Sequence, residues 1–181
     1  MGKIPFDVSV ILREFKYCYD VAQKSNDPST QVGAVVIAKE GDYYGTYSGY
    51  NTFLDMIEET PERLNDPTVK NLRISHAERN AIKSYRVHSR GQDPVGCTMI
   101  ATWASCANCA IEIIDSGIKT VITDYNIFRY NEMVRPSESY LGWNRSIHIA
   151  LDMFAEAGVN FLTVDDLPEY ANENTKDISI R

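Results

Sequence analysis

The chain has 181 residues and a formal net charge of −7, and 44% of its residues are hydrophobic and 24% charged, as in ordinary soluble domains. Its acidic balance argues against a general nucleic-acid surface, because such a surface needs a basic face that releases counterions. The sequence contains neither a long apolar run typical of a membrane span nor the pattern of a signal peptide, so we expect a cytoplasmic protein with no membrane partner.

Hydrophobic spacing predicts the elements in chain order. The first is an amphipathic helix at 7–24, and two strands at 31–38 and 43–49 follow it as a hairpin. A long loop over 50–75, with one helical turn at most, comes next. The remaining pattern alternates, with helices at 76–85, 106–117 and 143–158 and strands at 97–103, 119–124 and 159–164.

This order of elements predicts an α/β fold. The hairpin is followed by strands that alternate with helices, which implies right-handed parallel crossovers and a sheet covered on both faces. We therefore expect a three-layer α/β/α architecture around a five-stranded mixed sheet. It would form a single domain over residues 1–164, and an acidic tail would follow at 165–181.

The chain has four cysteines, too few for a disulfide scaffold. Cys18, in the first predicted helix, and Cys97, at the start of a predicted strand, are expected to be small core residues. Only Cys106 and Cys109, in the stretch ATWASCANCA, have a spacing with chemical meaning. Such a pair can be a redox disulfide, half of a metal site or two core residues near a turn.

Two predicted helix starts carry residues that bind metals. The stretch SHAER places His76 and Glu78 in the first turn of one helix, where Ser75 and Glu78 also form a capping-box pattern. The stretch SCANC begins the next helix, and Cys106 and Cys109 share one face of it. Both helix N-termini carry a partial positive charge, which favours thiolates.

Together these groups favour a catalytic zinc site. Two thiolates and the His76 imidazole bind zinc well, and three protein ligands leave the fourth tetrahedral position for water. Glu78 is placed to take a proton from that water and to hand it to a substrate nitrogen. A redox pair is disfavoured because it would not need His-Ala-Glu nearby, and a structural zinc is disfavoured because no fourth ligand has suitable spacing.

The pattern His-x-Glu followed by Cys-x-x-Cys is typical of zinc deaminases. The chain resembles the deoxycytidylate (dCMP) deaminases of the cytidine deaminase-like superfamily. The resemblance implies zinc on His76, Cys106 and Cys109, Glu78 as proton shuttle, and hydrolysis of dCMP to deoxyuridylate (dUMP), a dTMP precursor, and ammonia. The segments that carry it are KSNDPSTQVGAVVI, SGYN, HAERNAI, GCTMIATWASCANCA, IIDSGIKTVI and LDMFAEAGV.

The same resemblance implies further contacts and partners. It implies that Asn51 contacts the deoxyribose and that the loop with Ser25, Asn26 and Thr30 lies near the 5′-phosphate. It places Tyr125 where the family often has an aromatic residue over the pocket. It also implies a homo-oligomer, commonly a hexamer, and a nucleotide triphosphate effector with Mg²⁺ in the allosteric members.

The sequence departs from the family pattern at two places. Ser105 stands where most of these enzymes have proline before the first cysteine. Proline suits the start of a helix, but serine is a competent N-cap, so we expect the helix start to survive. The chain also continues GYN with TFLDM, in place of the Gly- and Pro-containing turn of the allosteric enzymes, which argues against triphosphate regulation.

Other interpretations stay open. A deaminase of the same fold could act on dCTP, cytidine, tRNA adenosine or a riboflavin precursor, and a non-catalytic zinc or nucleotide-binding module could share the scaffold. His88 and His148 are expected to lie on the surface or on a helix face, and Trp103 and Trp143 are expected to be packing residues. A basic cluster forms a solvated helix face, a subunit contact or a phosphate-binding surface, and consists of Lys70, Arg73, Arg79, Lys83, Arg86 and Arg90.

Overall fold

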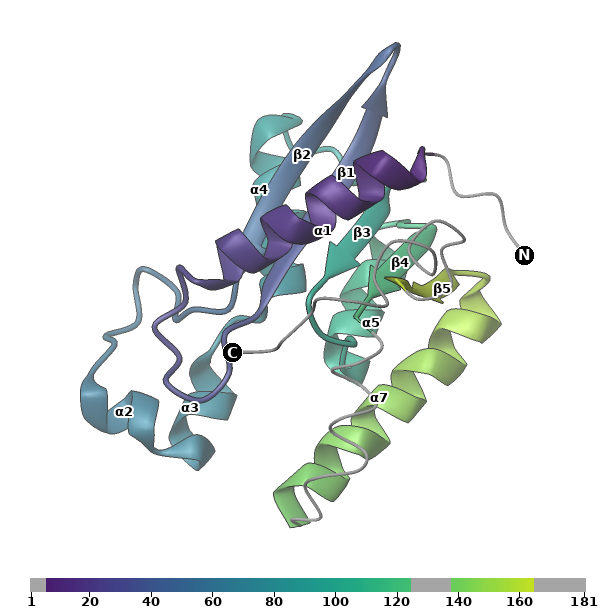
Figure 1. Cartoon of the computed structure of the whole chain (residues 1–181). Helices are drawn as coiled ribbons and strands as arrows, with labels where there is room; N and C mark the ends of the chain where they lie inside the picture. Colours follow the sequence, from purple (N-terminus) through teal and green to yellow (C-terminus); the bar gives the residue numbers. More distant parts are fainter. Residues whose placement is uncertain (1–5, 125–137, 165–181) are drawn as a thin grey trace, which may run out of the picture.

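The computed structural model describes residues 6–124 and 138–164, and a five-stranded sheet lies at its centre (Figure 1). The strands run in the order β2-β1-β3-β4-β5. β1 pairs antiparallel with β2 and with β3, whereas β3, β4 and β5 pair in parallel, so the predicted mixed sheet is confirmed. The bounds are β1 (Gly33–Glu40), β2 (Tyr43–Tyr50), β3 (Thr98–Ala101), β4 (Thr120–Thr123) and β5 (Asn160–Thr163).

Helices cover both faces of the sheet. Because side chains alternate along a strand, Val35 and Ile37 of β1 pack with α1, and Ala34 and Val36 pack on the opposite side with α4, α5 and α7. Figure 1 shows α1 crossing one face, and the three-layer α/β/α fold is confirmed. The described helices are α1 (Val8–Ala22), α2 (Pro61–Asn65), α3 (Pro67–Arg73), α4 (Ala77–His88), α5 (Ala107–Asp115) and α7 (Glu138–Ala157).

The segment between β2 and α4 is more regular than predicted. The sequence predicted one helical turn at most over 50–75, and the structure has the two short helices α2 and α3 there. Each begins with a proline that follows a capping residue: Thr60 accepts a hydrogen bond from its helix, and so does Asp66. α7 also begins at Glu138, earlier than the predicted 143.

Two predictions fall outside the described residues. The acidic tail at 165–181 and the position of Tyr125 both lie there. The core predictions for Cys18 and Cys97 are confirmed, since both side chains are buried.

α4 packs directly on β2, and this contact places the start of α4 beside the sheet. Gly49 makes the close approach possible, because a Cβ atom there would lie 2.3 Å from the backbone N of Ala81 and 2.6 Å from the carbonyl O of Ala77. α5 starts just after β3 ends, and β3 is the neighbour of β1. The starts of α4 and α5 therefore meet near the C-terminal end of β3.

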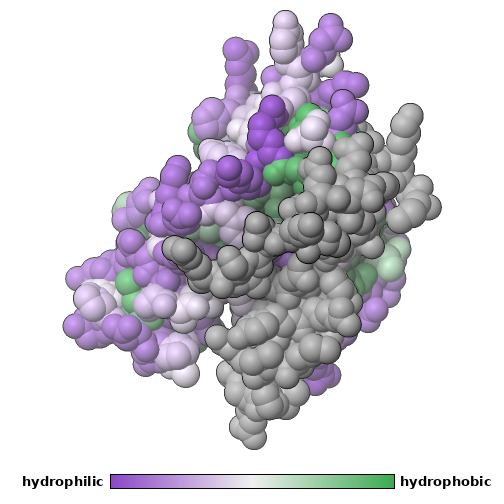
Figure 2. Space-filling view, in the orientation of Figure 1, coloured by the Kyte–Doolittle hydropathy of each residue, from purple (hydrophilic) through white to green (hydrophobic). Residues whose placement is uncertain are grey.

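The described surface in the view of Figure 2 is mostly hydrophilic, with small apolar areas. Among the helices of residues 6–124 and 138–164, none has the length and apolarity that a bilayer crossing requires.

Candidate functional site

His76, Cys106 and Cys109 come together at the starts of α4 and α5. Their ligand atoms all lie within 4.8 Å of one another. Nδ1 of His76 is 3.3 Å from Sγ of Cys109 and 3.5 Å from Sγ of Cys106. The two cysteines are buried, and His76 is partly exposed. Two sulfur atoms and one ring nitrogen at these separations form a donor set that suits zinc.

The two helix starts share one local geometry. His76 is the N-cap of α4 and Cys106 is the N-cap of α5, and both have extended backbone, with ψ of 155° and 167°. Neither side chain caps its own helix by a hydrogen bond. Both side chains are therefore available to the cluster, and a candidate ligand lies at the positive end of each helix.

The predicted capping box is wrong. Ser75 lies one residue before the N-cap, and its Oγ donates to Oδ1 of Asn80 at 2.8 Å. Glu78 lies in the first turn of α4, where its charge suits the helix dipole, and its carboxylate lies near the Cys109 thiol.

Ser105 is not the N-cap of α5 either. It is 2% exposed, and its Oγ has no hydrogen-bond partner among the described residues. The N–H of Ala107 instead donates to Oγ of Ser146, in α7, at 3.0 Å. The start of α5 does survive the change from proline, as expected, but a side chain from a distant helix supplies the capping contact.

Hydrogen bonds inside the cluster set its protonation. A bond with the Cys109 thiol lowers the pKa of Cys106 to about 4. The same bond raises the pKa of Cys109, and burial and the nearby Glu78 carboxylate raise it further. Burial lowers the pKa of His76, but the hydrogen bond to Cys106 and the charge of Glu78 outweigh burial, so that pKa is raised. A metal ion that binds there must displace protons from Cys109 and His76.

Glu78 lies beside the three candidate ligands and not among them. It is 4% exposed, and its carboxylate lies near enough to the Cys109 thiol to raise the pKa of that thiol. The three mutually close ligand atoms do not include it. A buried carboxylate in this position can exchange a proton with a molecule held at the cluster.

The structure brings three of the predicted substrate contacts into one network. Ser25 is buried, and its Oγ donates to the carbonyl O of Asn51 at 2.7 Å. Nδ2 of Asn51 donates to the carbonyl O of Thr30 at 2.9 Å. Asn26 is exposed and donates to Oε1 of Glu59 at 2.8 Å, so its side chain does not join that network.

The Asn51 side chain is buried and holds the loop before β1. Nδ2 donates to Oδ2 of Asp27 at 3.3 Å as well as to Thr30, and Oδ1 accepts from the N–H of Val32 at 2.8 Å. Both amide hydrogens are therefore used inside the protein, and Oδ1 keeps one lone pair for a ligand.

Lys70 differs from the other residues of the basic cluster because it is buried. It is 5% exposed, and its Nζ lies 2.7 Å from Oδ1 of Asp27, a contact that the sequence did not predict. Arg86 is also paired, with Asp93 at 2.7 Å and with Glu112 at 2.6 Å. The charges of Lys70 and Arg86 are thus compensated within the chain, and the cluster is not a uniform basic face.

Trp143 was expected to be a packing residue, but its ring contacts that of His76. Its ring centroid is 5.7 Å from that of His76, with an interplanar angle of 61°. The residue is 41% exposed, so it is not an ordinary packing residue. Its distance in sequence from the metal-binding motifs left no local signal for this contact.

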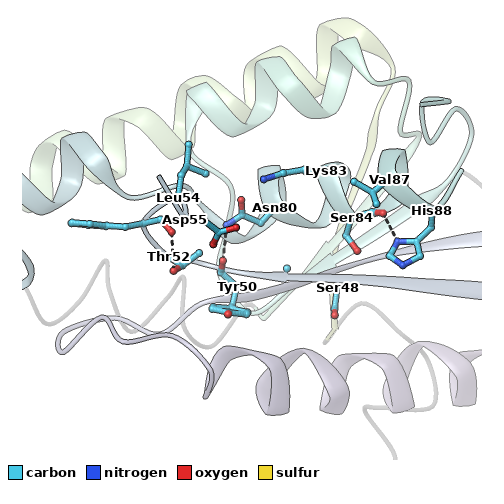
Figure 3. Close-up of a pocket in the computed structure, with 12 residues that line it drawn as sticks. Ser48, Tyr50, Thr52, Leu54, Asp55, Asn80, Lys83, Ser84, Val87 and His88 are labelled. Carbon is cyan, nitrogen blue, oxygen red and sulfur yellow. Dashed lines mark hydrogen bonds between the residues drawn. The ribbon is translucent and has the colours of Figure 1, made fainter. Parts of the chain in front are cut away.

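A hollow lies between α4, the end of β2 and the segment that follows β2. It has a volume of about 270 Å³, and neither Glu78 nor any of the three candidate ligands lines it. Figure 3 shows it between the end of β2 and the exposed face of α4. Its lining includes Tyr50, Thr52, Asp55, Asn80 and Lys83.

Relatives of the chain were identified by sequence. Residues 11–124 match the family described as the cytidine and deoxycytidylate deaminase zinc-binding region. The "uncharacterized deaminase in luxG 3′ region" of Aliivibrio fischeri is 33% identical over 148 residues, which are 81% of this chain and 88% of that protein. Deoxycytidylate deaminase of Mus musculus is 36% identical over 106 residues, 56% of each chain. The chain thus spans about half the length of that deaminase.

Solved structures share the fold. The dCMP deaminase of cyanophage S-TIM5 superposes with a TM-score of 0.60 at 18% identity, over 87% of this chain and 99% of that one. The same enzyme in complex with dCMP and dUMP gives a TM-score of 0.59 at 20% identity, over 90% and 99%. The sheet order, the paired helix starts and the matched region lead to one assignment: the chain belongs to the zinc-binding cytidine and deoxycytidylate deaminase family.

Proposed function

We propose that this protein hydrolyses dCMP to dUMP and ammonia. The observation that carries the proposal is the meeting of His76, Cys106 and Cys109 beside the buried Glu78 at two adjacent helix starts. The nucleotide substrate is supported by the similarity to mouse deoxycytidylate deaminase and to the cyanophage enzyme that binds dCMP and dUMP.

In this proposal His76, Cys106 and Cys109 hold zinc, and the donor set fits that metal. Bound zinc supplies Lewis-acid chemistry, which lowers the pKa of a water molecule toward neutrality. Glu78 takes one proton from the attacking water and delivers it to N3 of the pyrimidine ring. The oxygen of that water forms a bond to C4. Glu78 then moves the proton of the new C4 hydroxyl to the amino group as the C4–N bond breaks, so water and dCMP become dUMP and ammonia.

The substrate contacts are further parts of the proposal. Asn51 would accept a hydrogen bond from the sugar through the free lone pair of Oδ1. The loop with Ser25, Asn26 and Thr30 would lie near the 5′-phosphate, and Tyr125 would cover the pocket. A backbone carbonyl between Thr102 and Ala104, just after β3, would hold the amino group of the base.

The Glu78→Gln variant tests the mechanism. Glutamine has nearly the same shape but cannot take up the proton, so turnover of dCMP should fall by roughly 10²- to 10⁴-fold. Zinc content should stay at the wild-type level, because Glu78 is not one of the three clustered ligands. Near-normal ammonia release by this variant would show that Glu78 is not the proton shuttle.

A substrate panel tests the choice of dCMP. Ammonia release should be measured with dCMP, dCTP, cytidine and tRNA at equal enzyme concentrations. Turnover of another member without turnover of dCMP would reassign the substrate. Stoichiometric zinc without turnover of any member would favour a non-catalytic binding module.

The resemblance extends the proposal to a homo-oligomer, commonly a hexamer, which we place in the cytoplasm. The allosteric members of the family use a triphosphate effector with Mg²⁺, but the GYNTFLDM stretch of this chain argues against one. Light scattering of the purified protein measures the assembly. Sigmoidal dCMP kinetics that become hyperbolic on addition of dCTP and Mg²⁺ would support the effector, and unchanged kinetics would remove it.

A further inference from the structure

We propose that Asn80 is a positioning residue for His76, and that it acts through Ser75. The proposal rests on the zinc site of the proposed function, but not on the substrate. Asn80 does not belong to the cluster of ligand atoms, and no feature of the metal-binding motif requires an amide at this position.

The residue before His76 is hydrogen-bonded to the segment that directly follows β2. The chain leaves β2 at Tyr50, runs through α2 and α3, and returns at Ser75. There the N–H of Thr52 donates to the carbonyl O of Ser75 at 3.1 Å, and the N–H of Ser75 donates to the carbonyl O of Thr52 at 2.8 Å. This two-bond bridge holds the residue that immediately precedes the candidate ligand.

Asn80 connects α4, to which it belongs, with the end of β2 and with Ser75. Its Oδ1 accepts from Oγ of Ser75 at 2.8 Å, and its Nδ2 donates to the carbonyl O of Tyr50 at 2.7 Å and to that of Ser75 at 3.3 Å. Its own N–H donates to the carbonyl O of His76 at 3.1 Å. Figure 3 shows its side chain directed at Tyr50, where β2 ends.

Only an amide side chain of this length has the required groups. The side chain at position 80 faces the Ser75 hydroxyl, which needs an acceptor, and the carbonyl oxygens of Tyr50 and Ser75, which need donors. Asparagine carries both, whereas aspartate carries acceptors alone and alanine carries neither. The polar contacts of Asn80 are therefore matched to the backbone around Ser75.

These contacts reach the metal through the backbone of His76. His76 is an N-cap without a side-chain cap, so the direction of its imidazole depends on the backbone at Ser75 and His76. Groups that orient a metal ligand without touching the metal typically change metal affinity by roughly 10- to 100-fold. Loss of the Asn80 contacts should therefore weaken zinc binding even though all three ligands remain.

The test compares Asn80→Ala and Asn80→Asp with Lys83→Ala, an exposed change in the same helix. Competition with a chromophoric chelator gives the zinc affinity of each full-length protein without substrate. We expect a loss of roughly 10- to 100-fold for Asn80→Ala and none for Lys83→Ala. Asn80→Asp should also lose affinity, because its carboxylate places an acceptor against the carbonyl oxygens of Tyr50 and Ser75.

The absorption spectrum of the cobalt(II) form is the readout that separates positioning from general destabilisation. Its d–d and thiolate charge-transfer bands depend on ligand geometry, so they should shift in both Asn80 variants and stay unchanged in Lys83→Ala. If Asn80→Ala does not fold, Asn80→Asp and Ser75→Ala, which removes one bond alone, carry the comparison.

The two possible failures are distinguishable. A wild-type protein that binds zinc but does not turn over dCMP would refute the proposed function and leave this inference standing. Wild-type zinc affinity and cobalt bands in the Asn80 variants would overturn the inference. A wild-type protein that binds no zinc would overturn both.

Discussion

Nζ of Lys70 lies 2.7 Å from Oδ1 of Asp27, and the two side chains are 6% and 4% exposed. The pair joins α3 to the loop that precedes β1. The Asp27 carboxylate also accepts from the N–H of Ser29 at 2.9 Å, from the N–H of Thr30 at 3.1 Å and from Nδ2 of Asn51 at 3.3 Å. One buried carboxylate thus organises the loop that carries the predicted phosphate contacts.

Removal of Lys70 should destabilise the fold strongly. Lys70→Met keeps much of the side-chain volume but leaves the buried Asp27 charge without its cation, which costs about 3–5 kcal/mol. Urea unfolding of the variant and the wild type measures the difference. The double variant with Asp27→Asn serves as the control, because it removes both charges and should recover part of the loss. A loss of unfolding free energy below about 1 kcal/mol, which is typical of an exposed ion pair, would contradict a buried Lys70–Asp27 pair.

The Asp27 carboxylate should also make the free energy of unfolding depend on pH in the acidic range. Burial raises the pKa of Asp27, but the hydrogen bonds from Lys70 and Ser29 outweigh burial and hold it below the ordinary value. Since the folded pKa is depressed, the stabilisation is complete above the unfolded pKa of about 3.9 and is lost as pH falls through the folded pKa. Over this acidic range the unfolding free energy of wild type should fall more steeply than that of Asp27→Asn. Parallel curves for the two proteins would rule out this role.

Trp143 should report on the occupancy of His76. Its ring centroid lies 5.7 Å from that of the imidazole, and the chain has two tryptophans, so Trp103→Phe leaves Trp143 as the single tryptophan. Zinc addition should change the emission of Trp103→Phe, because the charge on His76 changes next to the indole. Trp143→Phe, which keeps Trp103, is the matched control and should respond less. Equal responses of the two variants would place the signal elsewhere.

Ser105→Pro should be tolerated. The hydroxyl of Ser105 is buried and makes no hydrogen bond within the described residues, and the capping contact of α5 comes from Ser146. Zinc content should therefore stay at the wild-type level. Ser105→Ala is the control for loss of the hydroxyl alone, which should be neutral or stabilising by about 1 kcal/mol. A large loss of zinc in Ser105→Pro with none in Ser105→Ala would show that the backbone of α5 begins differently from that of its relatives.

Local patterns in the sequence determined the fold class and the metal cluster. The hairpin followed by alternating strands and helices predicted the mixed sheet, because hydrophobic period and turn residues are short-range properties. His76 with Cys106 and Cys109 could be predicted because each helix start presents its ligands within one turn, and two such starts meet near the C-terminal end of β3.

Tertiary structure alone decided which distant groups support that cluster. The capping prediction for Ser105 failed because Ser146, 39 residues from its partner Ala107, contacts the start of α5. The capping box of Ser75 failed for a local reason, since Ser75 lies one residue before the N-cap and its hydroxyl bonds to Asn80, five residues away. Lys70 reads as a surface charge in the sequence, but it is buried against a carboxylate 43 residues away. Side-chain partners of this kind depend on how elements pack, and packing brings together residues whose separation in the chain leaves no periodic signal.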